Sequence, residues 1–167
     1  MNDIAYPGFD EKTVTKAEQL RRFFEYLSDN LKLMKAPLSV DLFGMTTTNT
    51  DDLNIGQVLE NTLPYFDYVA PMVYPSHYPP TFNGWKKPAT VPYELIKFVM
   101  EEGIKRTVAA SSTPNKLRPW LQDFDLGAVY TAPMVREQIQ ATYDVGLNSW
   151  MLWDASNKYT PSALEPK

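Results

Sequence analysis

The sequence predicts an α/β fold, and three observations favour it. Apolar segments typical of strands alternate with segments of helical spacing along the 167 residues. The connections are long enough for parallel crossovers, and the hairpin dipeptide Asn-Gly occurs only at Asn83-Gly84, inside a long loop. Strand-like segments run directly into polar or aromatic residues, as in sheets that build sites at the carboxyl ends of parallel strands; they are 39–44, 68–78, 118–124 and 149–159.

Length and composition narrow the function classes. A chain of 167 residues fits one domain, residues 1–167, with a real core. The net charge of −4 gives no positive surface for a polyanion, so we expect no nucleic-acid partner. There is no cysteine and His77 is the single histidine, so we expect no metal and no cofactor. No apolar run approaches the roughly 20 residues that span a bilayer, and the N-terminus lacks a signal pattern, so the chain as written is expected to be soluble.

The first elements are a strand end and a helix. Residues 4–6 are an apolar stub closed by Pro7-Gly8, which is typical of the end of a strand followed by a turn. From Thr15 onward apolar residues recur at helical spacing, and Thr15 with Glu18 has the pattern of a capping box. Pro37 ends the predicted helix. The apolar positions predict one buried face, made of Leu20, Phe23, Phe24, Leu27 and Leu31.

The next segment predicts two strands around a short helix. Residues 38–43 alternate between apolar and polar and bring Asp41 close to the end of a strand. A polar loop follows at 45–54. Residues 55–66 are expected to form a short helix, and a second strand is expected at 68–74.

A long loop and a helix come next. Residues 75–92 hold five prolines, which favours an irregular loop that serves as a lid or a rim. Pro92 suits the first turn of a helix that runs to about Glu102, with Gly103 as its C-terminal signal. Residues 104–110 are compatible with a strand.

The last elements are a strand, a helix and a strand. Trp120 and its neighbours predict the first strand. Helical spacing extends from Ala132 to Asp144 and ends at Gly146, and Ser149 to Trp153 predicts the final strand.

Asp41 is the first candidate for chemistry. Strand alternation places it on one face with Ser39, opposite Val40 and Leu42. A carboxylate on an inward strand face is costly unless it is used or paired, and it can act as acid, base or nucleophile. The alternative is that Asp41 caps the following loop or pairs with an arginine.

His77 is the second candidate, in the segment Pro75-Ser76-His77-Tyr78. An imidazole titrates near neutral pH and donates to a hydroxyl or a developing charge. Tyr74 and Tyr78 flank it and add to the expectation that this loop binds a ligand. The alternative is a solvated histidine that only holds the geometry of the loop.

Two further strand ends carry polar and aromatic residues. Asp123 and Gln122 end one strand, on which Arg118 is spaced to share a face with Trp120 and Gln122. The alternative to catalysis is an Arg-carboxylate pair that locks the strand ends.

Asp154 follows Trp153 at the last strand end, where an Asp is commonly a helix N-cap. The tryptophans suit stacking against sugar rings, although most Trp in a chain of this size are core residues.

Together these segments resemble the C-terminal part of a glycoside hydrolase family with a TIM-barrel domain, long catalogued as a domain of unknown function. The matching stretches cover Leu38 to Tyr159 and are SVDLFG, IGQVLE, DYVAPMVYPSHY, RPWLQDF, REQIQAT and WMLWDASNKY. The resemblance implies a partial (β/α)₈ barrel, roughly strands four to eight. It implies hydrolysis of a polysaccharide or oligosaccharide by two carboxylates, and we expect Asp41 to be one of them and Asp123 its companion. The implied substrate-binding residues are Tyr74, His77, Tyr78, Arg118, Trp120, Gln122, Trp153 and Asp154.

The sequence departs from the family in two ways. The fourth strand of the family usually carries Asp-Tyr-Ile-Arg-(Phe/Tyr)-Pro, where this chain has Asn2, Asp3 and Ala5 at the acid, tyrosine and arginine, so a catalytic carboxylate is missing there. A complete barrel needs about 250 residues, so we expect either a fragment or a half-barrel that must find a partner for its two open sheet edges, which otherwise invite self-association. An extracellular or cell-envelope location is implied by the family. The alternative function is a non-catalytic carbohydrate-binding or interaction module derived from such a barrel.

Overall fold

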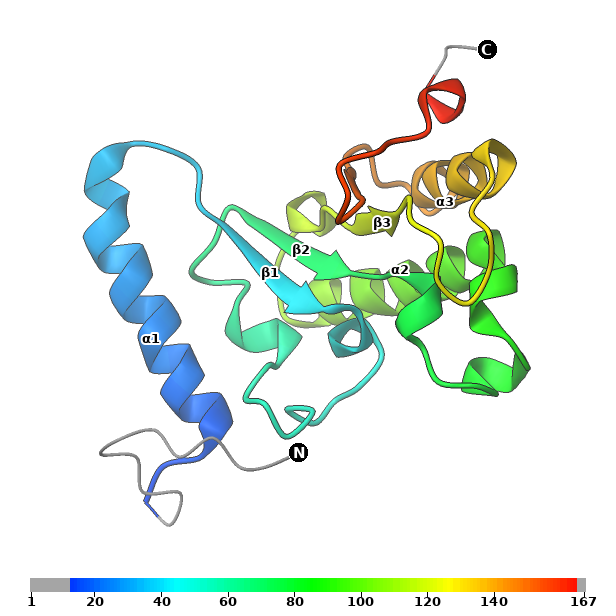
Figure 1. Ribbon diagram of the computed structural model, residues 1–167. Helices are drawn as coiled ribbons and strands as arrows, with labels where there is room; N and C mark the ends of the chain where they lie inside the picture. The colour runs from blue at the N-terminus through cyan, green and yellow to red at the C-terminus, as the bar shows by residue number, and fades with distance from the viewer. Residues whose placement is uncertain (1–12, 165–167) are drawn as a thin grey trace.

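Within residues 13–164, four parallel strands form one sheet in the order β1-β2-β3-β4 (Figure 1). The computed structural model describes residues 13–164, so the strand end expected at 4–6 lies outside the described residues. The strands are β1 (Ser39–Phe43), β2 (Tyr68–Met72), β3 (Trp120–Gln122) and β4 (Met151–Trp153), and the helices are α1 (Lys16–Leu31), α2 (Pro92–Ala109) and α3 (Ala132–Asp144). The predicted α/β class is therefore confirmed.

The two faces of the sheet differ in their exposure. The register places Phe43 beside Met72 and Met72 beside Trp120, so these side chains share a face. Asp41, two residues before Phe43, lies on that same face, and both are exposed. Leu42, between them, points to the opposite face and is fully buried. One face of the sheet is thus packed, and the other, which we call the open face, carries exposed side chains.

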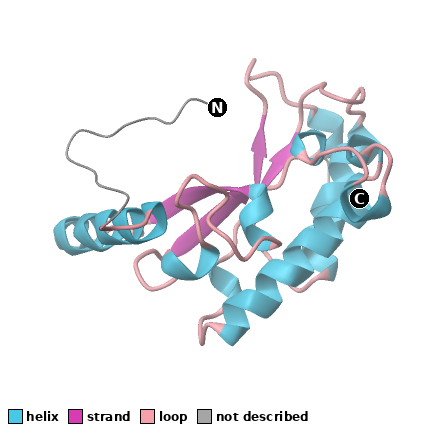
Figure 2. Ribbon diagram, turned by 90° about the horizontal axis from the view of Figure 1, so that it is seen from below, coloured by secondary structure: helices cyan, strands magenta, loops and turns pink. Residues whose placement is uncertain are grey.

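Helices α2 and α3 pack against each other and cover the packed face (Figure 2). Full burial of a Val, Leu, Ile or Met side chain contributes about 1.5 to 3 kcal/mol. The layer between the sheet and these two helices is therefore the main source of stability. The core joins residues of all these elements, among them Leu42, Val69, Leu95, Ile96, Val99, Met100, Leu121, Val135 and Ile139.

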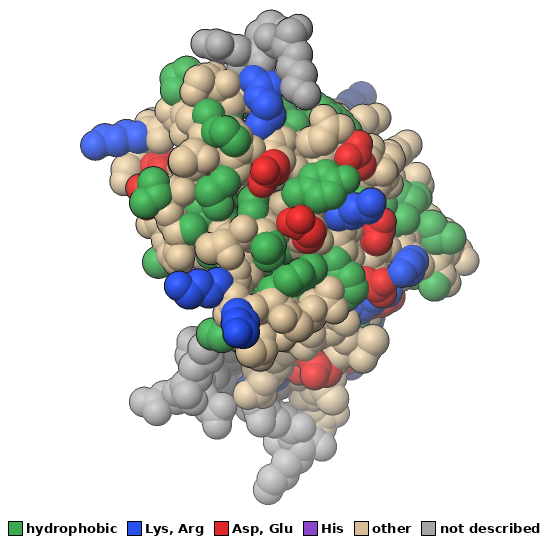
Figure 3. Space-filling model, turned by 90° about the vertical axis from the view of Figure 1, so that its right-hand side faces the viewer, with side chains coloured by type: hydrophobic (Ala, Val, Ile, Leu, Met, Phe, Trp, Pro, Cys, Tyr) green, Lys and Arg blue, Asp and Glu red, His purple; other side chains and the backbone are tan. Residues whose placement is uncertain are grey.

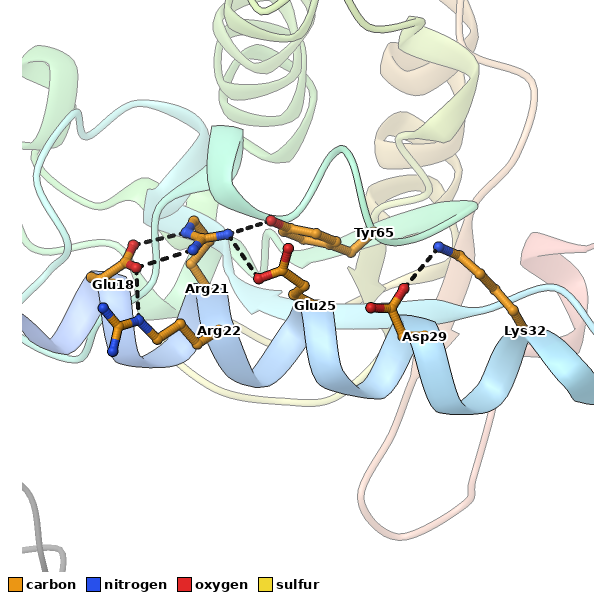
Figure 4. A network of polar contacts seen from close by, with 7 residues as sticks. All are labelled: Glu18, Arg21, Arg22, Glu25, Asp29, Lys32 and Tyr65. Carbon is orange, nitrogen blue, oxygen red and sulfur yellow. Dashed lines mark hydrogen bonds and ion pairs between the residues drawn. The ribbon is translucent and has the colours of Figure 1, made fainter.

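Helix α1 begins where the sequence predicts. The hydroxyl of Thr15 accepts a hydrogen bond from the backbone N–H of Glu18 at 3.1 Å, which confirms the N-cap. Hydrogen bonds from Arg21 and Arg22 to the Glu18 carboxylate lower its pKa to about 2 (Figure 4). Arg21 also donates to the hydroxyl of Tyr65, so this polar network joins α1 to the segment before β2.

The apolar face of α1 is only partly covered. Phe24 is buried and packs edge-to-face on Phe66, with ring centroids 5.3 Å apart. Phe23 and Tyr26 remain 51% and 63% exposed. Figure 1 shows α1 beside β1, apart from the layer that α2 and α3 form. The predicted face of α1 does contain the buried Phe24, but Phe23 on the same predicted face is exposed to solvent.

The helix expected at 55–66 is wrong. This segment contains only the short 3₁₀ turn Leu59–Asn61. Gly56 has a φ of +82°, which belongs to the left-handed region, and Pro64 lacks the N–H that a helix would use. Turns therefore replace the helix, although Leu59 and Leu63 are buried as the spacing indicated.

Arg106 fastens this irregular connection to α2. Its guanidinium donates to the two carboxylate oxygens of Glu60 at 2.8 and 2.5 Å. It also donates to the backbone carbonyls of Thr46, at 2.6 Å, and Asn49. Side-chain hydrogen bonds from α2, and not a regular helix, thus hold the segment after β1 in position.

Helix α2 begins at Pro92 as expected but passes through Gly103 and continues to Ala109. The expected end at Glu102 and the strand considered at 104–110 are both wrong. Gly103 is buried, and a Cβ there would lie only 3.3 Å from the Thr47 methyl carbon, so the glycine permits close packing. No strand intervenes, and β2 pairs directly with β3.

The surface mixes charges and apolar groups. On the face in Figure 3, acidic, basic and hydrophobic side chains are interspersed, and no continuous basic field is visible. None of the helices in residues 13–164 is both long and apolar enough to cross a membrane.

Candidate active site

Asp41 lies on the open face and is tied to a tryptophan of another strand. The Trp120 Nε1–H donates to Oδ1 of Asp41 at 2.9 Å. Because β2 lies between β1 and β3, the indole reaches across β2 to make this bond. Ala70, the partner of Asp41 in the register, has the small side chain that such a crossing needs. The open face therefore presents an oriented carboxylate at the edge of an indole ring.

A second indole extends this surface. Trp120 and Trp153 are in edge-to-face contact, with ring centroids 5.8 Å apart and an interplanar angle of 82°. Trp153 is 43% exposed, and Phe43 on β1 is 56% exposed. Exposed aromatic rings beside a carboxylate suit the C–H faces and hydroxyl groups of a sugar.

Tyr74 and His77 form an aromatic cluster at the end of β2. Their ring centroids are 5.2 Å apart, and the ring of Phe124 lies 5.4 Å from Tyr74 and 6.0 Å from His77. Burial raises the pKa of the Tyr74 hydroxyl, and electrostatic interactions with Asp41 and Tyr159 raise it further. Burial lowers the pKa of His77.

Asp123 differs from Asp41 in its surroundings. It is only 4% exposed, and its two oxygens accept hydrogen bonds from the backbone N–H of Thr160 at 2.8 Å and from the Thr160 hydroxyl at 2.7 Å. Its own N–H donates to the carbonyl of Trp153. In this arrangement Asp123 holds the segment after β4 against the end of β3.

Asp154 and Gln122 also bind backbone groups. The Asp154 carboxylate accepts from the N–H groups of Ser156 and Lys158, at 2.6 and 3.2 Å, and so caps the turn after β4. Gln122 is fully buried, and its amide joins the backbone of Ser76 to that of Phe124.

Neither Arg118 nor Tyr78 makes a hydrogen bond or ion pair with Asp41 among the described contacts. Arg118 precedes β3, where its N–H donates to the carbonyl of Val69 and its guanidinium lies 5.7 Å from the ring centroid of Tyr68. The strand-locking pair with a carboxylate is not seen among the described ion pairs. Tyr78 is buried in the core and packs on Phe82.

The structure therefore divides the ten residues into groups. Asp41, Trp120 and Trp153 share the open face, and Tyr74 with His77 adjoins it at the end of β2. Gln122, Asp123 and Asp154 hold loops, Tyr78 is in the core, and Arg118 is at the start of β3. The functional role of each residue stays a prediction.

Sequence reasoning missed three aromatic residues. Phe43 shares the open face, Phe124 completes the cluster around His77, and Tyr159 couples electrostatically to Tyr74. Alternation along 39–43 was a sufficient signal for Phe43, because it is two residues beyond Asp41. Phe124 and Tyr159 lie beyond the ends of β3 and β4, where strand alternation no longer predicts which way a side chain points.

Residues 13–164 contain no group of three or more His, Asp and Glu side chains that could hold a metal ion. Two surface hollows of the described chain lie away from the open face. One is bounded by Ser28, Leu38 and Phe66, and the other by Leu63, Ser111 and Lys116.

Comparison with known proteins defines the class. Residues 2–159 match the family model described as "Putative glycosyl hydrolase domain", and the chain belongs to this family. A solved structure with a similar fold is the glycoside hydrolase domain of PgaB (BpsB) from Bordetella bronchiseptica, with a TM-score of 0.55 and 17% sequence identity. The match covers 86% of this chain but only 41% of that one. No similar protein was found among the curated proteins.

Proposed function

We propose that this chain is the part of a glycoside hydrolase that carries the substrate-facing carboxylate Asp41, and that its substrate is a polysaccharide or oligosaccharide. Family membership supports the reaction class. The observation that carries the proposal is the hydrogen bond from Trp120 to Asp41, beside Trp153 on the open face. This is a carboxylate held against aromatic rings on a surface that a glycan can reach.

The geometry suits carboxylate chemistry at the glycosidic bond. The indole N–H binds only Oδ1, which leaves Oδ2 directed to a ligand as acid, base or nucleophile. Hydrolysis of this kind uses two carboxyl groups about 5 to 9.5 Å apart. Asp123 remains the proposed companion, and it would have to release Thr160 to act. Tyr74 and His77 are proposed to line the sugar site, at the end of β2.

We further propose that β1 to β4 are strands five to eight of a (β/α)₈ barrel, with the open face as the barrel interior and 1–167 as one partial domain. All-parallel sheets are normally covered on both faces, and here α2 and α3 cover one of them. An eight-stranded barrel closes the other face on itself. We also propose self-association through the outer edges of β1 and β4, which have no strand partner within residues 13–164.

A second candidate function is a non-catalytic carbohydrate-binding module. The burial of Asp123 and its two bonds to Thr160 favour it, because only Asp41 then remains free to act. Aromatic stacking on Trp120 and Trp153 would bind glycans without turnover.

The decisive experiment assays a panel of glycans for new reducing ends and for binding, with the wild type, Asp41→Asn and Asp29→Asn. Asp29 is an exposed carboxylate on α1 and serves as the matched control. We expect Asp41→Asn to lower hydrolysis by about 10² to 10⁴-fold, the usual contribution of an acid or base, while binding persists.

The outcomes separate the candidates. Hydrolysis that is equal in Asp41→Asn and Asp29→Asn removes Asp41 from the mechanism. Binding without any product supports the module, and the absence of binding to every glycan contradicts both functions.

A further inference from the structure

Gln122 uses both ends of its side-chain amide inside the protein. The side chain is 0% exposed. Its Oε1 accepts from the N–H of Ser76 at 3.1 Å, and its Nε2 donates to the carbonyl of Phe124 at 2.9 Å and to that of Leu126 at 3.4 Å. A residue whose position at a strand end suggested ligand binding is therefore occupied by backbone groups of two loops.

The backbone of Gln122 is held just as firmly. Gln138, also 0% exposed, accepts from the N–H of Gln122 at 2.9 Å and donates to its carbonyl at 2.8 Å. Gln138 lies on α3, which packs against the core. The two buried amides thus form a chain of hydrogen bonds from α3 through β3 to the loop after β2.

The two loops joined by Gln122 carry the aromatic cluster. Ser76 precedes His77 in the 3₁₀ turn η4 (Pro75–His77), and Phe124 supplies the ring 6.0 Å from the imidazole. The Tyr74 ring closes the cluster, at 5.2 Å from His77. Movement of either loop would change the surroundings of the imidazole.

We propose that Gln122 is a positioning residue, supported by Gln138, which holds the His77 loop and Phe124 together and so fixes the imidazole beside the open face. A primary amide offers a donor and an acceptor at once, and both are needed to join an N–H on one loop to a carbonyl on another. The importance of this position for catalysis rests on the proposed function, but the positioning itself does not.

Gln122→Met tests the proposal, since methionine has a similar length and neither polar end. Thr107→Val is the control, because it removes a buried hydroxyl that bonds only within α2, at 2.8 Å from the Gly103 carbonyl. His77 is the single histidine of the chain, so its NMR titration is unambiguous.

In Gln122→Met we expect the Ser76 amide to exchange about fivefold faster or more, the effect of one lost hydrogen bond. Loss of the desolvating loop should also raise the pKa of His77 toward its ordinary value of 6.5, since burial is what lowers it. Thr107→Val should destabilise the protein yet leave both readings unchanged. An unchanged Ser76 exchange rate and His77 pKa in folded Gln122→Met would overturn the proposal.

These measurements use the free protein, so they do not depend on a glycan. Failure of every glycan to bind or react would contradict the proposed function and leave the positioning intact. Should Gln122→Met not fold, amide exchange in the wild type decides: the Ser76 amide should exchange several-fold more slowly than the amide of Lys86, an exposed residue, and equal rates would contradict the proposal.

Discussion

Asp41 and Asp123 are both aspartates at or near the ends of parallel strands of one sheet, β1 and β3, yet their surroundings are opposite. Asp41 is exposed on the open face and accepts one hydrogen bond, from the indole of Trp120. Asp123 is 4% exposed, and its two oxygens accept from Thr160. The Asp41 carboxylate is oriented and still accessible to a ligand, whereas the Asp123 carboxylate already binds backbone and side-chain groups of the protein.

The comparison teaches that a strand-end position brings a carboxylate to the right edge of a sheet but does not give it a role. Burial and hydrogen-bond partners decide whether the charge is left for a ligand or used to fasten a loop. The same holds for Gln122, which lies at a strand end but whose amide binds the backbone of two loops. Three experiments test whether the two strand ends differ in this way.

The largest effect on stability is expected for Asp123→Ala. The change removes a buried acceptor of two hydrogen bonds and leaves Thr160 unpaired, which should lower the free energy of unfolding by about 2 to 4 kcal/mol. Asp41→Ala, on an exposed surface, should change it by less than about 1 kcal/mol. Urea denaturation of the two variants measures the difference, and equal losses would break the comparison.

Trp120→Phe sharpens the contrast at the Asp41 end. The ring remains but the N–H that orients Asp41 is lost, so hydrolysis should fall about tenfold while glycan affinity changes little, since a hydrogen bond to a charged group contributes about 1.5 to 3 kcal/mol. Trp150→Phe is the matched control, because its indole N–H binds the hydroxyl of Tyr143 at 3.0 Å instead. Equal activity in the two variants would show that the Trp120 bond does not orient Asp41.

The smallest effect concerns pH. Burial lowers the pKa of His77, so the unfolded state takes up a proton more readily than the folded state. The stability that depends on the neutral imidazole is complete above pH 6.5 and is lost as the pH falls from 6.5 through the folded pKa. Urea midpoints of the wild type and His77→Asn should therefore diverge in their pH dependence below pH 6.5. Parallel curves would mean that His77 is not desolvated.

Much of the fold follows from local pattern. Helix α3 spans Ala132–Asp144 as predicted, and Thr15 caps α1 as predicted. Each of these features depends on residues that are close together in the sequence. The predictions failed where distant contacts decide. Gly103 has the local pattern of a helix end, yet packing against Thr47 makes it an interior position of α2.

By itself the sequence determined the α/β class, the face of β1 on which Asp41 lies, and the family resemblance, since these depend on periodicity and on motifs. Only the tertiary structure decided that Trp120 reaches Asp41 across 79 positions of the chain and that Asp123 binds Thr160. Such bonds join segments far apart in sequence, and which of them form depends on strand order, register and burial.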